Sequence, residues 1–338
     1  MKTALITGVR GQDGAYLSQL LLSKGYEVYG ADRSGDSGLW RLRELGIEGR
    51  VKEVYLDILE LSNIMDVMEK VRPDEIYNFA AQSFVQTSFE QPILTAEINA
   101  IGVARLLEAA RKVCPGARFF QASTAELFGG TGAAPKSEGT DFHPKSPYAV
   151  AKLYAHWLTV NYREAYGLHA SCGILFNHES PMRGEEFLTR KISMAAARIK
   201  KGVQEKVAVG NLEGRRDWGY AGEYVDAMWR MLQQPKAGDY VLATGETHTV
   251  REFIEAAFAA AGLPLRWEGK GVEERGVDAD GKTRVEVSKE FYRPTEVECL
   301  TGDAAKARAA LGWKPATGFK DLAALMVAAD MKRLEEKR

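Results

Sequence analysis

The sequence predicts an α/β fold in which a doubly wound parallel sheet is followed by a smaller mixed α/β lobe. Three observations lead to this prediction. Short apolar runs alternate with helical patterns through the first half of the 338-residue chain, as in proteins with a parallel sheet. Three closely spaced glycines come directly after the first apolar run. Beyond residue 175 the alternation weakens and the segments become more mixed, which indicates a second, discontinuous lobe.

The first elements predict a strand, a turn, a helix and a strand. An apolar run at residues 3–8 suits a strand buried on both faces, and residues 15–23 show helical periodicity before a second strand at 26–31. The glycines of the turn are three residues apart: Gly8, Gly11 and Gly14. This order opens a Rossmann unit. Because glycines let the backbone approach a pyrophosphate, and a helix N-terminus offers it free N–H groups, a dinucleotide site is expected here.

Small and polar residues follow the next strands at their carboxyl ends, where parallel sheets bind ligands. Strands are expected at residues 51–56, 75–79 and 118–122, and later at 170–175. Asp57 follows the first of these, where its carboxylate can meet an adenine amino group or, equally well, cap a helix or a turn. Small residues after the second strand let the backbone pass close to a cofactor, and we expect contacts from Ala80, Ala81 and Gln82.

The stretch at residues 146–152 (SPYAVAK) carries the expected acid/base pair. Tyr148 and Lys152 are four residues apart, so a helix stacks their side chains on one face. A nearby ammonium favours the phenolate, and the pKa of the tyrosine is expected to fall from ~10 toward neutral pH. Thr124 and Glu126, at the end of an earlier strand, are expected to converge on the same pocket. The alternative is an ordinary helix face, since this spacing often arises by chance.

The later part of the chain is predicted to be more varied. A basic helix is expected at residues 183–201, another helix at 222–232, a strand at 240–244 and a last amphipathic helix from about residue 320. Residues 269–289 are rich in charge and glycine, which is typical of an exposed excursion.

These patterns predict two lobes with ligands in the cleft between them. Residues 1–175 are expected to form the dinucleotide-binding domain, to which segments at about 215–250 return. Residues 176–338 are expected to form mainly a discontinuous substrate-binding lobe.

Composition excludes several classes of partner. A net charge of -1 provides no field for nucleic acid or an anionic membrane surface. No apolar run approaches the ~18 residues of a membrane span, and no signal peptide is expected. The three cysteines, Cys114, Cys172 and Cys299, lack metal-ligand spacing, so we predict no metal site and expect reduced thiols in the cytoplasm.

Several stretches together resemble the extended short-chain dehydrogenase/reductase superfamily and, within it, the GDP-mannose 4,6-dehydratases. The similarity runs from residue 4 to about 315. The matching stretches include TGVRGQDG at residues 7–14, AQS at 81–83, SPYAVAKLYAHW at 146–157, FNHESP at 176–181, RDWG at 216–219 and YRPTEV at 292–297.

The resemblance implies a lyase that converts GDP-mannose to GDP-4-keto-6-deoxy-mannose and water. By this resemblance Tyr148 takes the proton of the C4 hydroxyl while hydride passes to a nicotinamide, and Lys152 lowers the pKa of the tyrosine and holds the nicotinamide ribose. Glu126 removes the C5 proton and assists loss of the C6 hydroxyl, and Thr124 hydrogen-bonds near C4. The hydride then returns to C6.

The resemblance also implies binding residues. Cofactor contacts are implied at Gly8, Gly11, Gln12, Asp13, Asp57, Ile58, Ala81, Tyr148, Lys152, His178 and Arg183. Nucleotide-sugar contacts are implied at Ser83, Asn177, Lys191, Arg216, Arg293 and Glu296. Lys191, Arg216 and Arg293 suit the GDP diphosphate because of their charge, and arginine pairs bidentately with phosphate. The alternative for each of the three is a surface salt bridge.

The end of the second strand departs from the resemblance. The similar enzymes usually have Arg-Arg-Ser-Ser there, which binds the NADP 2′-phosphate and joins a neighbouring subunit's loop. This chain has Asp32 and Arg33, with one arginine only. An acidic residue there normally accepts a ribose 2′-hydroxyl and repels a phosphate, so NADP is expected from the resemblance and NAD is the alternative. A homo-oligomer, dimer or tetramer, is also implied.

Two other functions are weighed. An epimerase or reductase acting on a related GDP-sugar or GDP-heptose would use Tyr148 and Lys152 without loss of water. A non-catalytic nucleotide sensor would keep the glycine turn but usually lose the tyrosine or the lysine, and both are present.

Overall fold

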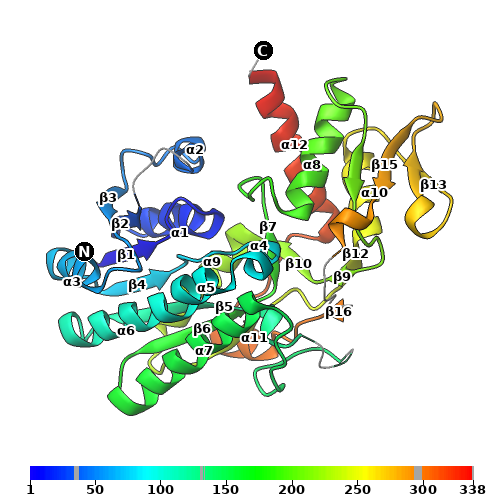
Figure 1. The fold of residues 1–338 in the computed structure, drawn as a ribbon. Coiled ribbons are helices and arrows are strands. Elements are labelled where there is room, and N and C mark those ends of the chain that lie inside the picture. Colours follow the sequence, from blue (N-terminus) through cyan, green and yellow to red (C-terminus); the bar gives the residue numbers. More distant parts are fainter. Residues whose placement is uncertain (34–37, 130–131, 133, 293–298, 337–338) are drawn as a thin grey trace.

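The computed structural model describes residues 1–33, 38–129, 132, 134–292 and 299–336. Its main feature is a seven-stranded parallel sheet with the strand order β11-β6-β5-β4-β1-β2-β3 (Figure 1). The strands are β1 (Thr3–Thr7), β2 (Glu27–Asp32), β3 (Lys52–Tyr55), β4 (Glu75–Asn78), β5 (Arg118–Thr124), β6 (Ala170–Leu175) and β11 (Tyr240–Leu242). The order reverses between β1 and β4, which is where such sheets bind ligands. The predicted fold class is therefore confirmed.

Helices cover both faces of this sheet. Each face has its own apolar core, one including residues of α1 and α9 and the other residues of α3 and α6. The helices around the sheet are α1 (Gln12–Ser23), α2 (Leu39–Glu44), α3 (Leu61–Val71), α4 (Val85–Glu90), α5 (Pro92–Ala96), α6 (Gly102–Val113), α7 (Pro147–Tyr166), α9 (Ala221–Gln233) and α11 (Ala305–Leu311). Short turns of other helix types follow α5 and β5: η1 (Glu97–Ile101), a π-helix, and η2 (Ala125–Leu127), a 3₁₀-helix.

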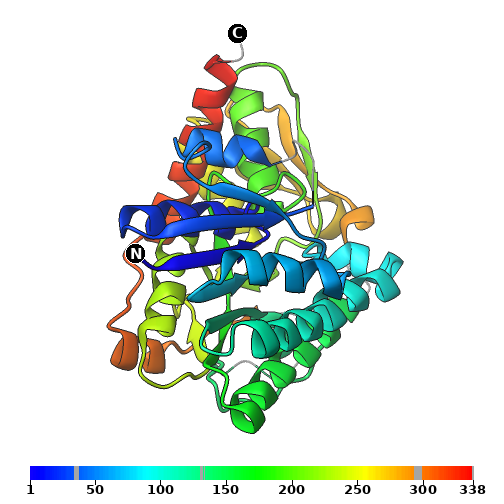
Figure 2. The ribbon, with the colours of Figure 1, turned by 90° about the vertical axis from the view of Figure 1, so that its left-hand side faces the viewer.

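Smaller sheets and three helices form the rest of the molecule. The helices α8 (Leu188–Lys200), α10 (Val250–Ala260) and α12 (Phe319–Glu336) share one apolar core, and α8 and α12 run side by side away from the large sheet (Figures 1 and 2). A four-stranded sheet has the order β13-β14-β15-β8. Its strands are β13 (Arg266–Glu268), β14 (Arg275–Val277), β15 (Thr283–Val287) and β8 (Val207–Val209).

Two further small sheets join distant segments. One contains β12 (His248–Thr249), β9 (Arg215–Arg216) and β16 (Cys299–Leu300), and the other β7 (Asn177–Glu179) and β10 (Trp218–Tyr220). The remaining short 3₁₀ turns are η3 (Gly271–Glu273) and η4 (Lys289–Phe291). None of the helices in the described part of the chain combines the length and apolarity needed to cross a bilayer.

The prediction of an exposed excursion at residues 269–289 is wrong for the paired strands β14 and β15, whereas residues 269–273 and 279–282, before and between these strands, are exposed as predicted. Val277 and Val285 are buried, and β15 pairs with β14 and β8. Asp278 is also buried, and its carboxylate accepts a hydrogen bond from Arg284 Nε at 2.6 Å. The charges misled the prediction because they lie on the outward face of alternating strands, whose other face reaches the core.

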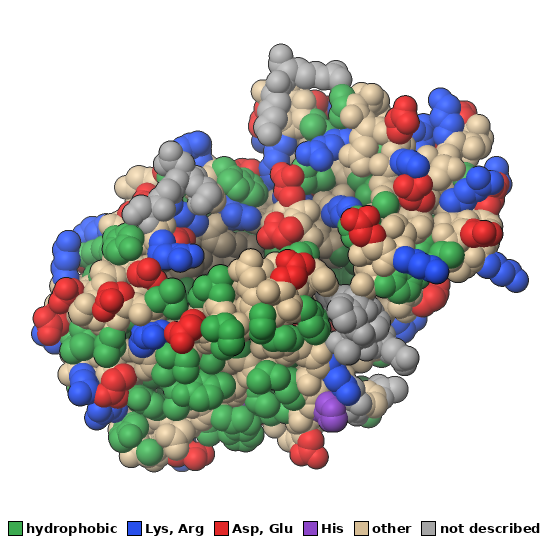
Figure 3. All heavy atoms as spheres, in the orientation of Figure 1, with side chains coloured by type: hydrophobic (Ala, Val, Ile, Leu, Met, Phe, Trp, Pro, Cys, Tyr) green, Lys and Arg blue, Asp and Glu red, His purple; other side chains and the backbone are tan. Residues whose placement is uncertain are grey.

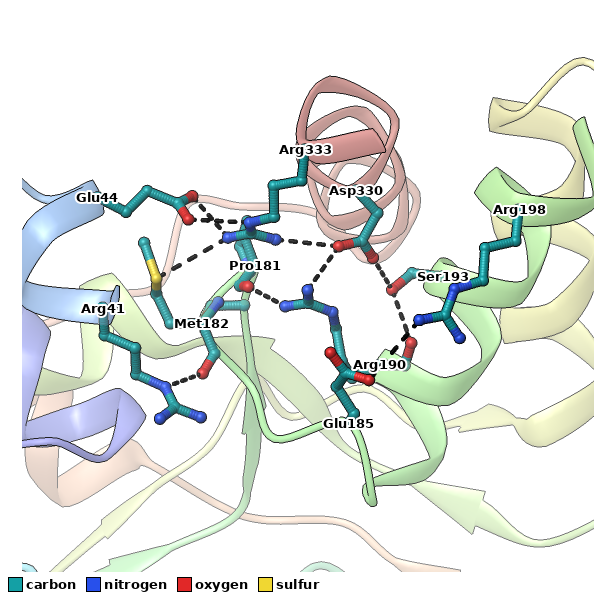
Figure 4. A network of polar contacts seen from close by, with 11 residues as sticks. Arg41, Glu44, Pro181, Met182, Glu185, Arg190, Ser193, Arg198, Asp330 and Arg333 are labelled. Carbon is teal, nitrogen blue, oxygen red and sulfur yellow. Dashed lines mark hydrogen bonds and ion pairs between the residues drawn. The ribbon is translucent and has the colours of Figure 1, made fainter. Parts of the chain in front are cut away.

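An ion-pair network joins α12 to α8 and α2 (Figure 4). Asp330 of α12 pairs with Arg190 of α8 at 2.7 Å and with Arg333 at 3.0 Å, and both Asp330 and Arg190 are almost fully buried. Arg333 also pairs with Glu44 of α2 at 2.6 Å. Arg190 donates to the carbonyl of Pro181, which lies in the loop after β7. The network therefore holds this loop, α8 and α12 in one arrangement.

We expect Asp330→Ala to lower the free energy of unfolding by about 3–5 kcal/mol, because it leaves the buried guanidinium of Arg190 without its carboxylate. Denaturant unfolding followed by circular dichroism measures the change. Glu336→Ala is the matched control, since it removes an exposed carboxylate paired with Lys332 on the same helix, and we expect a change of about 0.5 kcal/mol or less. Equal effects of the two substitutions would contradict the role given to the network.

Candidate active site

The glycine turn after β1 brings three backbone segments unusually close together. Gly8 has φ +68°, and a Cβ there would lie 2.9 Å from the backbone N of Ala80. A Cβ on Gly14 would lie 2.5 Å from the carbonyl oxygen of Gly8. Gly11 is the N-cap residue of α1, and no side chain caps the N–H groups of the first helical turn. The turn therefore fits a pyrophosphate, which needs close backbone approach and helical N–H groups.

The first two side chains of α1 connect the turn to β7. The Gln12 amide donates to the carbonyl of His178 at 2.9 Å and its oxygen accepts from the Ser180 hydroxyl at 2.7 Å. Asp13 and His178 form a buried pair, with Oδ2 and Nε2 2.9 Å apart. Burial is the largest single effect and opposes both charges, but the attraction and the hydrogen bond between the two groups, with smaller contributions, together outweigh it, so the pKa of Asp13 is lowered and that of His178 is raised. The side chains of these predicted cofactor contacts thus also hold the turn against β7 and the residue that follows it.

The structure brings Thr124, Tyr148 and Lys152 together at the end of β5. Tyr148 is the second residue of α7, directly after Pro147, and the Ser146 hydroxyl caps the helix by accepting the backbone N–H of Ala149 at 3.1 Å. Tyr148 is 9% exposed and Lys152 is 5% exposed. The Lys152 ammonium donates to the carbonyl of Ala122 on β5 at 3.1 Å. The Thr124 side chain hydrogen-bonds that of Tyr148.

The expected fall in the pKa of Tyr148 is wrong for the chain by itself. Burial raises the pKa of Tyr148 to about 12, a change that the nearby Glu126 carboxylate increases and the Thr124 hydrogen bond reduces. Burial also lowers the pKa of Lys152 to about 8. The lysine ammonium lies 5.9 Å from the centroid of the tyrosine ring, so desolvation outweighs the attraction on which the prediction relied.

Glu126 lies on η2, immediately beyond β5, and at the same sheet edge as Tyr148. Its backbone N–H donates to the Thr124 hydroxyl at 3.2 Å. This hydrogen bond holds the backbone of Glu126 against the Thr124 side chain. The negative charge of the Glu126 carboxylate acts on Tyr148 to raise the pKa of the phenol. A carboxylate, a hydroxyl and a phenol are therefore within electrostatic reach of one another.

The loop after β4 is held by a residue that sequence reasoning missed. Asn99, which is 1% exposed, accepts from the backbone N–H of Gln82 at 2.8 Å and donates to its carbonyl at 2.8 Å. Asn99 lies on the π-helical turn η1, a feature often found at functional sites. The backbone N–H of Ala80 contacts the Thr7 hydroxyl at 3.2 Å. The only sequence signal for Asn99 was a polar residue within an apolar helical pattern. Its spacing did not predict contact with the loop after β4.

Two predicted cofactor contacts, Asp57 and Ile58, lie after β3, and Asp57 was expected to meet an adenine amino group. Oδ1 of Asp57 accepts the backbone N–H of Leu59 at 3.0 Å, so the alternative of a turn-capping aspartate is realised. Ile58 is buried and packs against Gly102, where an added Cβ would lie 2.8 Å from the isoleucine side chain. Their contact with a cofactor stays a prediction.

Arg183 lies in the loop between β7 and α8. Its Nε is 3.1 Å from Oε2 of Glu179, and its guanidinium lies 3.7 Å from the centroid of the Phe187 ring. Its positive charge acts on both Tyr148 and Asp13 to lower their pKa values. The loop between β7 and α8, which Arg190 holds through the carbonyl of Pro181, therefore places the positive charge of Arg183 near Tyr148 and the glycine turn.

The predicted nucleotide-sugar contacts are spread over several elements. Asn177 is on β7, Ser83 is exposed in the loop after β4, and the buried Arg216 on β9 donates to the carbonyl of Arg215 at 2.8 Å. Lys191 on α8 lies 3.5 Å from the Phe291 ring centroid, and burial lowers its pKa. Arg293 and Glu296 lie outside the described residues.

Asp32 ends β2 and faces backbone N–H groups. Its Oδ1 accepts from the N–H of Arg33 at 2.8 Å. Burial raises the pKa of Asp32, opposed by hydrogen bonds from the backbone of Arg33 and Arg10 and by both guanidinium charges. Arg10 lies within the glycine turn and was not predicted as a site residue.

A second group of titratable side chains lies behind Thr124. His156, Cys172 and Asp239 each offer a potential ligand atom, all within 4.8 Å of one another. The Asp239 carboxylate is held by two hydrogen bonds from Arg163, at 2.8 and 2.9 Å, and Nδ1 of His156 is 3.2 Å from the Ser123 hydroxyl. Burial raises the pKa of the Cys172 thiol well above its ordinary value. The Arg163–Asp239 ion pair and the contact between Ser123 and His156 tie this cluster into the fold.

A nucleotide turn on a parallel sheet, with a helical tyrosine and lysine at the sheet edge, defines the extended short-chain dehydrogenase/reductase class. A sequence profile described as GDP-mannose 4,6 dehydratase matches residues 5–326. The chain therefore belongs to the GDP-mannose 4,6-dehydratase family.

Curated relatives agree with this assignment over nearly their whole length. The GDP-mannose 4,6-dehydratase of Sinorhizobium fredii (strain HH103) is 52% identical, covering 100% of this chain and 99% of that protein. The human GDP-mannose 4,6 dehydratase is 47% identical, covering 97% of this chain and 91% of that protein.

Solved structures share the fold. The Thermus thermophilus UDP-glucose 4-epimerase complex with NAD has a TM-score of 0.80 and 28% identity, covering 97% of this chain and 98% of that one. The Bacillus anthracis dTDP-glucose 4,6-dehydratase in complex with NAD has a TM-score of 0.82 and 22% identity, covering 99% and 98%.

Proposed function

We propose that this chain is a lyase that converts GDP-mannose to GDP-4-keto-6-deoxy-mannose and water. The observation that carries the proposal is the placement of Glu126 beside Thr124 and Tyr148 at one sheet edge, in a chain of this family. A reductase needs a tyrosine, a lysine and a hydroxyl only. Removal of water across C5 and C6 needs a further acid/base group, and Glu126 supplies it.

The side chains divide the work by their charge and position. Tyr148 accepts the proton of the C4 hydroxyl, and Thr124 holds the same oxygen. The resulting ketone acidifies C5, where Glu126 removes the proton and then protonates the departing C6 hydroxyl. Lys152 stabilises the phenolate of Tyr148 and binds the nicotinamide ribose. A nicotinamide cofactor held by the glycine turn and Lys152 would supply the hydride acceptor for C4 and the hydride donor for C6, so the reaction would need no external oxidant.

NADP is the proposed cofactor, as the family resemblance implies, with NAD as the alternative because of Asp32. The turn at Gly8, Gly11 and Gly14 fits the pyrophosphate, since added side chains would fill it. The first lobe is proposed to hold the cofactor and the second to hold GDP-mannose, through Lys191 and Arg216 among others. The three cysteines are free, which supports a reducing compartment such as the cytoplasm.

Incubation of the purified chain with GDP-mannose tests the proposal. A 4-keto-6-deoxy sugar nucleotide, identified by mass spectrometry as the loss of one water, is expected without added reductant. An epimerase would give a product of unchanged mass, and a reductase would turn over only with added reduced cofactor. Either result would overturn the dehydratase assignment.

We also propose that the chain forms a homo-oligomer through the outer face of α5, η1 and α7. Figure 3 shows hydrophobic side chains gathered over the region where these helices lie. The exposed apolar residues there are Ile93, Leu94, Ile101, Val150, Tyr154 and Trp157. Those on α7 recur at intervals of four and three residues, which forms one stripe. Two copies related by a twofold axis would bury the same helices against each other.

We expect Tyr154→Glu combined with Trp157→Glu to convert the oligomer to monomers, because two carboxylates would be desolvated at the contact. Light scattering after size-exclusion chromatography measures the mass. The control is Val203→Glu, which changes an exposed apolar residue elsewhere in the described chain and should leave the mass unchanged. A wild-type chain that is monomeric at micromolar concentration would contradict the proposal.

A further inference from the structure

Arg10 is a charged residue held in place inside the glycine turn. Its side chain is only 13% exposed, and Nη2 donates to Oε2 of Glu53 on β3 at 2.6 Å. Its backbone carbonyl accepts from Nη1 of Arg41 at 2.9 Å, and Gly38, at the start of α2, lies directly against its Cβ. These contacts with α2 fix the backbone of Arg10, and with it the position from which its guanidinium extends.

The sheet register places Arg10 between two carboxylates. Gly30 pairs with Glu53 and Asp32 pairs with Tyr55 in the parallel β2–β3 ladder. Because paired residues and their neighbours two positions along point to the same face, Asp32 and Glu53 share a face. Gly30 has no side chain between them. The Arg10 guanidinium bonds Glu53 and acts on Asp32 through its charge.

This place is where a Rossmann unit distinguishes NADP from NAD. A carboxylate at the end of the second strand accepts the ribose 2′-hydroxyl, whereas a nearby arginine accommodates a 2′-phosphate. The carboxylate of Asp32 is directed to the backbone N–H of Arg33. The charges of two arginines, Arg10 in the turn and Arg33 after the strand, act on this carboxylate.

We propose that Arg10 binds the 2′-phosphate of NADP in this chain by exchanging the Glu53 carboxylate for the phosphate, at the end of β2 where Arg33 supplies a second positive charge. The inference rests on the proposed function, which requires a nicotinamide cofactor. Glu53 is 46% exposed and returns to water when it is released. A guanidinium–phosphate pair is bidentate and charge-assisted, whereas a half-exposed ion pair contributes little, so the exchange favours the phosphate.

Direct binding measurements test this assignment. NADPH and NADH are titrated separately into the cofactor-stripped chain and followed by nicotinamide fluorescence. Arg10→Gln should weaken NADPH binding by roughly 10- to 100-fold, which is the effect of losing hydrogen bonds to a charged group, and change NADH binding by less than about twofold. Glu53→Gln should strengthen NADPH binding, because it removes the competing carboxylate.

Lys52→Gln is the matched control. It removes a cation that bonds Glu27 on the other face of the same two strands, so the ratio of NADPH to NADH affinity should stay at the wild-type value. Equal weakening of both cofactors by Arg10→Gln, or no change in either, would overturn the assignment. A wild-type chain that binds NADH more tightly than NADPH would also overturn it. Failure of the dehydratase assignment is separate, since it is read from the mass of the sugar nucleotide formed.

Discussion

Glu126→Gln is expected to lower the rate of GDP-mannose dehydration by about 10²- to 10⁴-fold, the usual contribution of a general acid/base group. The amide keeps the size of the carboxylate but cannot take the C5 proton. Product is measured by mass spectrometry, and oxidation at C4 is measured by quenching with sodium borodeuteride. Deuterium at C4 of the recovered sugar is expected with this variant.

Two further variants separate the role of Glu126 from a general loss of structure. Tyr148→Phe should leave C4 without deuterium, because the first proton cannot be removed. Glu60→Gln changes an exposed carboxylate that caps α3 through the N–H of Ser62, and should retain the wild-type rate. Normal dehydration by Glu126→Gln would show that another group acts at C5.

Lys152→Met is expected to abolish dehydration and yet to stabilise the cofactor-free chain. Burial lowers the pKa of Lys152 to about 8, so at pH 7 the fold holds a charged ammonium in an unfavourable site. At ~1.4 kcal/mol for each tenfold change, this charge costs about 3 kcal/mol. Methionine removes that cost, less the loss of the hydrogen bond to Ala122, and denaturant unfolding at pH 7 should show the gain.

The pH dependence has a definite sign. Below pH about 8 both the folded and the unfolded chain carry the charge on Lys152, so the full cost is present. Between about 8 and ~10.4 the unfolded chain binds a proton that the folded chain does not, and wild-type stability rises with pH. The advantage of Lys152→Met should therefore shrink over this range. The exposed Lys236 is the control, and Lys236→Met should change stability by about 0.5 kcal/mol or less. A less stable Lys152→Met variant at pH 7 would contradict the argument.

The sheet and the positions of the proposed catalytic residues could be predicted from the sequence because they depend on local patterns. The apolar run before Gly8 and the glycines after it predict β1 and the turn, and four-residue spacing on a helix places Tyr148 near Lys152. Glu126 follows from its place at the end of a strand. These inferences need only one element at a time.

Features that depend on packing between distant segments were missed. The pKa of Tyr148 depends on burial by several elements, which outweighs the ammonium one turn away. The β14–β15 pair was predicted to be an excursion because charged residues outnumber its inward valines. The roles assigned to Asn99 and Arg10 depend on their contacts with Gln82 and Glu53, which are 17 and 43 positions away in the sequence. No spacing rule predicts contacts between such distant residues.

The strand order has a consequence for how the chain folds. β1 lies in the middle of the sheet, so pairing can extend outward from it in both directions, but β11 reaches the edge of β6 only at residue 240. Until β11 has been made, one edge of the wholly buried strand β6 has no partner strand, and such unpaired edges bind strands of other chains. Nascent or clipped molecules that end before residue 240 should therefore aggregate and depend on chaperones, whereas those that include the Arg163–Asp239 ion pair and β11 close that edge.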